Sequence, residues 1–144
     1  MDKEAFTLVE LLIVVSIIGI LAGVAIAVIN PNKVRGRARD GVRKNDIAVI
    51  KGAIENYYAE NNIYPATGTI PFGGVWANYL KLVPQDPLIA GGASWVQYCY
   101  ASIDANNFIL CAKVEDSNSA YVPSGASPCG GIAVTEAYCA QNPF

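Results

Sequence analysis

Histidine is absent from this 144-residue sequence, and charged side chains make up only 15% of it. The missing imidazole removes the commonest general base and a common metal ligand, and a cysteine nucleophile would lack its usual partner. Asp104 and Asp116 do not form the pattern of a paired-acid site. The net charge of −2 implies neither a specific nucleic-acid partner nor an acidic one. We therefore expect a protein that is not an enzyme and has no cofactor and no metal site.

Cysteine is missing from the first two thirds of the chain. All four cysteines lie in the last third: Cys99, Cys111, Cys129 and Cys139. An even number in an exported domain predicts two disulfides, with three possible connectivities. Cys99 and Cys111 lie at nearly equal distances from a predicted turn at 104–107, and Cys129 and Cys139 could close a small C-terminal loop. We expect the pairs 99–111 and 129–139. The alternative is that a tail cysteine joins the tail to the predicted hairpin.

Apolar residues, in contrast, form one long run near the N-terminus. No charged side chain occurs from Leu11 to Ile29, and no proline occurs before Pro31. A run of about 18 or more apolar residues can cross a bilayer as one helix. It exceeds the roughly 7–15 residues of a signal-peptide core, and the preceding MDKEA lacks a basic start. We predict a membrane-spanning helix that continues past a bend at Pro31.

Glu10 stands at the head of this apolar run. A carboxylate within a membrane span costs about 2.5–3.5 kcal/mol near the helix centre, less towards an end, and usually has a function and a partner. One interpretation is that Glu10 lies near enough to the membrane surface to reach water. The other is that Glu10 is paired when the helix packs against copies of itself. The nearest cation would then be a new N-terminus at Phe6, one helical turn away.

The segment AFTLVE at residues 5–10, followed by an apolar helix, resembles the class III signal of type IV pilins and type II secretion pseudopilins. The resemblance implies that a prepilin peptidase cuts between Ala5 and Phe6 and methylates the new amine of Phe6. It also implies that Glu10 is the acid used in assembly. Ala5 stands where the family usually has glycine. Residues 38–65 and 78–87 are similar to the major pseudopilin subgroup, so the resemblance covers roughly the first 90 residues.

The resemblance implies a structural subunit of an extracellular type IV pilus-like filament, assembled by helix packing from an inner-membrane pool. One alternative is a major pseudopilin of type II secretion, whose filament spans the periplasm. Another, from a different class, is a non-polymerising single-pass membrane anchor whose exported domain binds a ligand or surface. The implied partners are identical subunits in a helical homopolymer, the prepilin peptidase, an inner-membrane assembly platform, and the membrane itself before assembly.

A basic cluster follows the apolar run, and Asp40 is its only acid: Lys33, Arg35, Arg37, Arg39, Arg43 and Lys44. We expect a solvated helix face. Contacts with acids of neighbouring subunits are an alternative, and DNA binding is a weaker one. The positive-inside rule would hold this cluster in the cytoplasm, whereas the resemblance places it outside. Farther along, Glu115 to Asn118 offers oxygen ligands but does not match an EF-hand, so we expect a solvated turn.

The remaining pattern predicts an α+β fold. Ile47, Ile50 and Ile54 form an apolar helical stripe, and Asn61-Asn62 ends that helix. A loop with one short helix is expected over 66–92, and a hairpin over 95–115, with a short edge strand at 132–134. We divide the chain into a leader (1–5), a membrane or filament-core helix (6–30), its amphipathic continuation (31–62), and a loop plus small antiparallel sheet with a disulfide-bonded tail (63–144).

Overall fold

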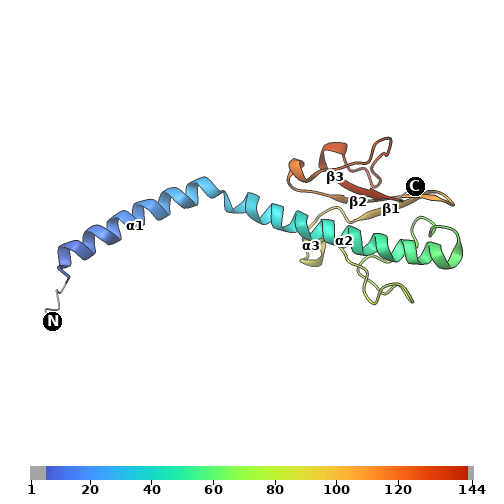
Figure 1. Cartoon of the computed structure of the whole chain (residues 1–144), viewed down its shortest axis with the longest axis horizontal. Coiled ribbons are helices and arrows are strands. Elements are labelled where there is room, and N and C mark those ends of the chain that lie inside the picture. The colour runs from blue at the N-terminus through green and yellow to red at the C-terminus, as the bar shows by residue number, and fades with distance from the viewer. Residues whose placement is uncertain (1–5, 143–144) are drawn as a thin grey trace. The chain divides into compact units, whose positions relative to one another are not determined.

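The computed structural model describes residues 6–142 and divides the chain into two compact units, with the boundary between Arg35 and Gly36. Helix α1, Leu8–Ile29, makes up most of the first unit (Figure 1). Thr7 caps its N-terminus by accepting a hydrogen bond from the Glu10 backbone N–H, which satisfies one of the free donors of a helix start. The large apolar side chains described along α1 are exposed.

The second helix, α2, spans Pro31–Asn61 and begins one residue after the end of α1. Asn30 lies between them in the left-handed conformation, with φ 42°. Proline suits the first position of a helix because no carbonyl is available there to accept an N–H. The expected continuous helix with a bend at Pro31 is therefore wrong in detail. The helix is interrupted at Asn30, and Pro31 starts a new one.

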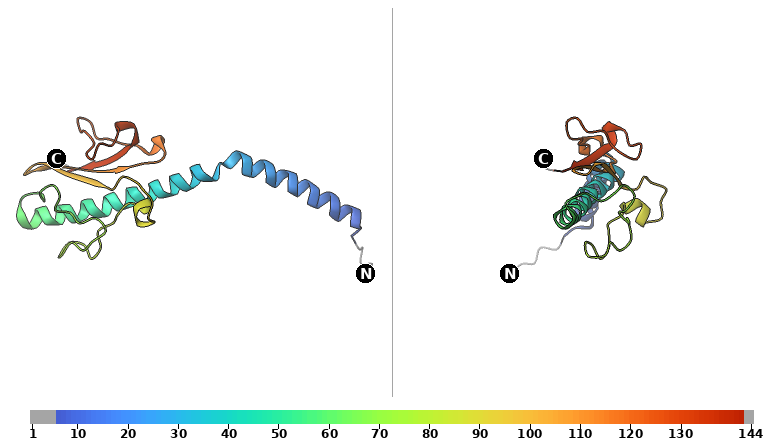
Figure 2. Two further views of the ribbon diagram at one scale, coloured as in Figure 1. Left: turned by 180° about the vertical axis from the view of Figure 1, so that it is seen from behind. Right: turned by 90° about the vertical axis from the view of Figure 1, so that its right-hand side faces the viewer.

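A three-stranded antiparallel sheet lies against α2 (Figures 1 and 2). Its strands are β1 (Cys99–Asp104), β2 (Asn107–Lys113) and β3 (Ala137–Gln141), in that order across the sheet. The predicted stripe of Ile47, Ile50 and Ile54 is buried and shares one core cluster with Phe108 and Leu110 of β2. The α+β class and the hairpin are confirmed.

The third strand is not where we expected it. Residues 132–134 lie outside the sheet, and β3 begins three residues after them, at Ala137. The tail instead covers the face of the sheet opposite α2, where Ile132 packs with Ile109, Cys111 and Cys139. The sheet is thus a middle layer between α2 and the C-terminal tail. One short helix, α3 (Pro87–Ala90), lies in the loop where one was predicted.

Candidate functional site

The apolar surface of α1 is the first feature with functional meaning. Leu8–Ile26 has a mean hydropathy of 2.7 and is 0% buried, and this helix is long and apolar enough to cross a membrane by length and composition. A soluble domain does not leave such a surface in water, because burying it is strongly favourable. The helix therefore needs lipid or other helices around it.

Glu10 begins this surface and completes a capping box. The Thr7 backbone N–H donates to Glu10 Oε2 at 2.9 Å, and the Thr7 hydroxyl donates to the same oxygen at 2.8 Å. The Thr-x-x-Glu spacing is a sequence signal for this motif, and our sequence reasoning missed it. Phe6 is 83% exposed beside the box. Ala5, the other side of the predicted cut, lies outside the described residues.

A second site, in the domain, centres on a buried arginine. Arg43 of α2 is 0% exposed and donates from Nε to Asp86 Oδ2 at 2.6 Å and from Nη1 to Asp40 Oδ1 at 2.7 Å. Nη1 also reaches Glu115 Oε1 at 2.8 Å. Burial alone would lower the pKa of Arg43, but hydrogen bonds to the three carboxylates raise it. The guanidinium therefore joins α2 to the loop before α3 and to the end of β2.

The expected solvated basic face is therefore wrong for Arg43, whereas Arg37 and Arg39, with side chains 54% and 32% exposed, are partly solvated and also paired with acids. Besides Arg43, Arg37 pairs with Asp116 at 2.6 Å and Arg39 pairs with Glu115. Their acids lie more than 70 residues away in the sequence, so sequence spacing could not reveal them. Among the residues that the structure describes, Lys33 and Arg35 have no ion-pair partner, and for them the expectation stands.

The turn after β2 is exposed, as expected, at Glu115, Ser117 and Asn118, but Asp116 is buried. Asp116 is 9% exposed, and its backbone N–H donates to Asp40 Oδ2 at 2.9 Å. The hydrogen bond from Arg39, together with Arg43, lowers the pKa of Glu115 from 4.5 to about 2. Both carboxylate oxygens of Glu115 and Oδ2 of Asp116 therefore accept hydrogen bonds from arginines of the same chain.

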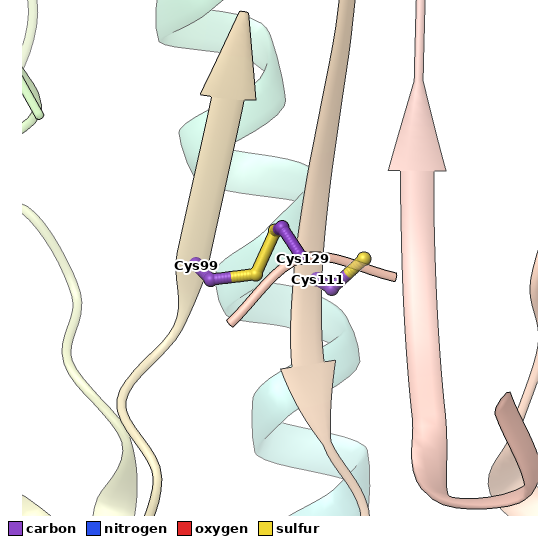
Figure 3. A group of neighbouring side chains, drawn as sticks. All are labelled: Cys99, Cys111 and Cys129. Atoms are coloured by element: carbon purple, nitrogen blue, oxygen red, sulfur yellow. A yellow bond between two sulfur atoms is a disulfide. The ribbon is translucent and has the colours of Figure 1, made fainter. Parts of the chain in front are cut away.

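Both disulfides differ from the pairs that we predicted. Cys99 is bonded to Cys129, and Cys111 to Cys139. Cys99 and Cys111 do face each other across β1 and β2, and Cys111 faces Cys139 across β2 and β3. Figure 3 shows the Cys99–Cys129 bond in front of the sheet and the sulfur of Cys111 beside it. The alternative in which the tail is joined to the hairpin is the one observed.

The backbone explains why Cys111 pairs with Cys139. The Cys139 N–H donates to the Tyr121 carbonyl at 2.7 Å, so it points away from β2. Cys111 and Cys139 are therefore a non-hydrogen-bonded pair, the closer kind, with Cα atoms 4.1 Å apart. The backbone groups of Cys111 then point to β1, which makes Cys99 the more distant of its two neighbours. Our prediction failed because β3 was not recognised.

An unburied apolar helix with a capped acid at its head, followed by a small disulfide-bonded α+β domain, defines a pilin-like subunit. A family model described as the prokaryotic N-terminal methylation motif matches residues 1–26. The type II secretion system core protein G of Aeromonas hydrophila is 30% identical over 98 residues, covering 59% of this chain and 67% of the relative. The chain belongs to the type IV pilin and pseudopilin family, and it is a pilin-like filament subunit.

Two further relatives show how far the similarity extends. Core protein G of Pseudomonas aeruginosa is 35% identical over 99 residues, which cover 60% of this chain and 68% of the relative. The fimbrial protein EcpC of Eikenella corrodens is 36% identical over 64 residues, which cover 44% of this chain and 40% of the relative. No solved structure matches the fold at a significant level.

Proposed function

We propose that this chain is the repeating subunit of a type II secretion pseudopilus. The observation that carries the filament role is the apolar surface of α1, which is 0% buried over Leu8–Ile26 and requires a surrounding of lipid or helices. The secretion role is supported by relatives named core protein G, which align over 97 to 102 residues. Those alignments are longer than α1 and therefore extend into the domain.

The mechanism that we propose moves α1 from lipid into a core of like helices. Lipid tails and a bundle of Leu, Ile and Val side chains are similarly apolar, so extraction costs little on hydrophobic grounds. Packing between helices and interhelical polar contacts then supply the gain. The prepilin peptidase and an inner-membrane assembly platform would act on the membrane-anchored precursor, and the leader of residues 1–5 would remain in the cytoplasm.

Glu10 is the residue that we assign to subunit register. Within one subunit its Oε2 accepts two hydrogen bonds from Thr7, but the negative charge has no cation within the described part of α1. A filament core excludes water and penalises this charge. The N-methylated amine of Phe6 on a neighbouring subunit would relieve the penalty in one register. Cleavage before Phe6 therefore has a direct purpose in assembly.

An intact mass of the protein recovered from the cell envelope tests this function. We expect a species that lacks residues 1–5, carries one additional methyl group, and gains four hydrogens on reduction of its two disulfides. A secretion role further predicts that cells without this chain lose a set of exported proteins but keep their surface fibres. A full-length species found only in membranes would instead identify a non-polymerising anchored protein.

A surface fimbria is the second candidate, and the similarity to the fimbrial protein EcpC favours it. That alignment spans 64 residues, fewer than any of those with core protein G. Under this alternative the processed subunit would occur in long surface fibres, and deletion would remove the fibres without affecting secreted proteins.

A further inference from the structure

The four cysteine sulfurs lie in one group on the tail-covered face of the sheet. Sγ atoms of Cys99, Cys111 and Cys129 all lie within 4.8 Å of one another, and Cys111 is bonded to Cys139 (Figure 3). Cys99 therefore has two sulfurs within reach: that of Cys129, to which it is bonded, and that of Cys111, which belongs to the other disulfide. The two disulfides are neighbours, so a thiolate formed in one can attack the other.

The two disulfides differ in their access to solvent. Cys111 and Cys139 are 0% and 1% exposed, whereas Cys99 and Cys129 are each partly exposed. Thiol–disulfide exchange requires access to a sulfur atom. A reductant in solution therefore reaches the Cys99–Cys129 bond first. Attack on Cys129 is the route that frees Cys99, the register partner of Cys111, as a thiolate.

We propose that Cys99–Cys129 is an entry site for dithiol reductants, and that one reduction event there releases both tail cysteines. In the first step a thiolate of the dithiol bonds to Sγ of Cys129 and breaks the bond to Cys99, which leaves as a thiolate. The second thiol of the reductant then bonds to the first. This step frees Cys129 as a thiol and leaves the reductant as a disulfide.

The second stage is internal and needs no additional electrons. The Cys99 thiolate attacks Sγ of Cys111, the bond between Cys111 and Cys139 breaks, and Cys139 leaves as a thiolate that takes up a proton. The two electrons and two protons lost by the dithiol thus end on Cys129 and Cys139. The new bond joins residues that are already register partners. Hydrogen-bonded antiparallel pairs have Cα atoms about 5.5 Å apart, which is within the range that disulfides accept.

The exchange has a defined structural consequence. Both native bonds join the tail to the hairpin, with sequence separations of 30 and 28 residues. After exchange the only disulfide lies within the hairpin, and no covalent bond holds β3 or the tail on the sheet. A single dithiol would thereby uncover the face on which Ile132 packs, while α2 and the hairpin remain joined. The class of partner is a small dithiol or a protein with two neighbouring thiols.

Limited reduction followed by alkylation tests this proposal on the full chain in detergent micelles. The oxidised protein is treated with one molar equivalent of dithiothreitol, then with iodoacetamide, and is digested without further reduction. We expect alkyl groups on Cys129 and Cys139, together with a peptide pair joined by Cys99–Cys111. Alkylation of Cys99 and Cys129 with the Cys111–Cys139 bond intact would overturn the exchange step. Alkylation of Cys111 and Cys139, or of no cysteine, would overturn the entry site.

A matched double variant isolates the role of Cys99. Cys99→Ser with Cys129→Ser keeps the Cys111–Cys139 bond but removes both the exposed disulfide and the internal nucleophile. Under the same conditions we expect alkylation of Cys139 to slow at least tenfold relative to the unaltered chain. An unchanged rate would mean that the reductant reaches the buried bond directly, and the proposal would be wrong.

Discussion

Arg43 and Asp86 form an ion pair in which both side chains are 0% exposed, with 2.6 Å between Nε and Oδ2. Asp86 also caps α3 by accepting the Leu88 N–H at 2.8 Å, so its charge is satisfied by two elements of the fold. A buried ion pair adds little stability relative to well-packed apolar residues, but loss of one partner leaves an uncompensated charge. This asymmetry makes the pair a sensitive test of the fold.

Replacement of the arginine should therefore be costly. Arg43→Ala leaves Asp40 and Asp86 buried without their cation, and we expect a loss of about 3–5 kcal/mol in the free energy of unfolding. Arg35→Ala is the control, because Arg35 is exposed and should change stability by less than about 0.5 kcal/mol. Urea unfolding of both variants measures the difference. Equal free energies of unfolding for the two variants would show that the ion pairs of Arg43 are not needed for the fold.

Acid should weaken the ion pairs that Glu115 makes with Arg39 and Arg43. Hydrogen bonds from Arg39 and Arg43 lower its pKa from 4.5 to about 2. A carboxylate with a lowered pKa contributes stability that is complete above the unfolded-state pKa and is lost as the pH falls through the folded-state value. The difference in unfolding free energy between wild type and Glu115→Gln should thus shrink from about pH 4.5 towards pH 2. A difference independent of pH would contradict this assignment.

Substitution by alanine should change the stability of the domain in opposite directions at two glycines. Gly130 has φ +68°, and a Cβ there would lie 3.0 Å from the Cβ of Cys99, so Gly130→Ala should destabilise the domain. The left-handed backbone alone costs about 1–2 kcal/mol for a residue with a Cβ. Gly52 lies inside α2 with nothing within 4 Å, so Gly52→Ala should stabilise by about 0.5–1 kcal/mol. Thermal unfolding measures both variants against the unaltered chain. A Gly130→Ala variant more stable than Gly52→Ala would contradict the geometry of the tail at Gly130.

The features predicted correctly from the sequence are those with a local signal. The stripe of Ile47, Ile50 and Ile54 repeats at helical spacing, and the hairpin shows a turn between two β-rich runs. The long apolar helix is evident from composition alone. Each of these patterns depends on neighbours within about ten residues, which is why one sequence suffices to detect them.

Most of the errors concern contacts between distant parts of the chain, and the helix break at Asn30 is a local exception. Arg43 looked solvated because Asp86 and Glu115, two of its three acids, follow it by 43 and 72 residues. The strand β3 has the sequence AYCAQ, whose small side chains carry a weak strand signal. Without β3 the partner of Cys111 could not be identified, so one missed strand produced two wrong disulfides. The capping box of Thr7 and Glu10 has a local sequence signal, the Thr-x-x-Glu spacing, so sequence distance does not explain why it was missed.

That capping box makes the role of Glu10 testable, because cap and charge can be removed separately. Glu10→Gln keeps an oxygen that can accept from Thr7 but loses the negative charge. Thr7→Val keeps the charge and the shape of residue 7 but loses the hydroxyl that donates at 2.8 Å and accepts from the Glu10 N–H at 3.2 Å. Loss of an N-cap costs about 0.5–2 kcal/mol, which a helix held in a membrane can tolerate.

If Glu10 acts by pairing with a neighbouring amine, Glu10→Gln should remain in the membrane and yield at least tenfold less assembled filament, while Thr7→Val assembles nearly normally. If Glu10 acts only as a cap, the ranking reverses, because the Gln variant retains the capping hydrogen bonds and the Val variant does not. Circular dichroism of both variants in micelles checks that α1 stays helical. Immunoblots of assembled filament and of membrane fractions, with processing of residues 1–5 confirmed by mass, decide between charge and cap.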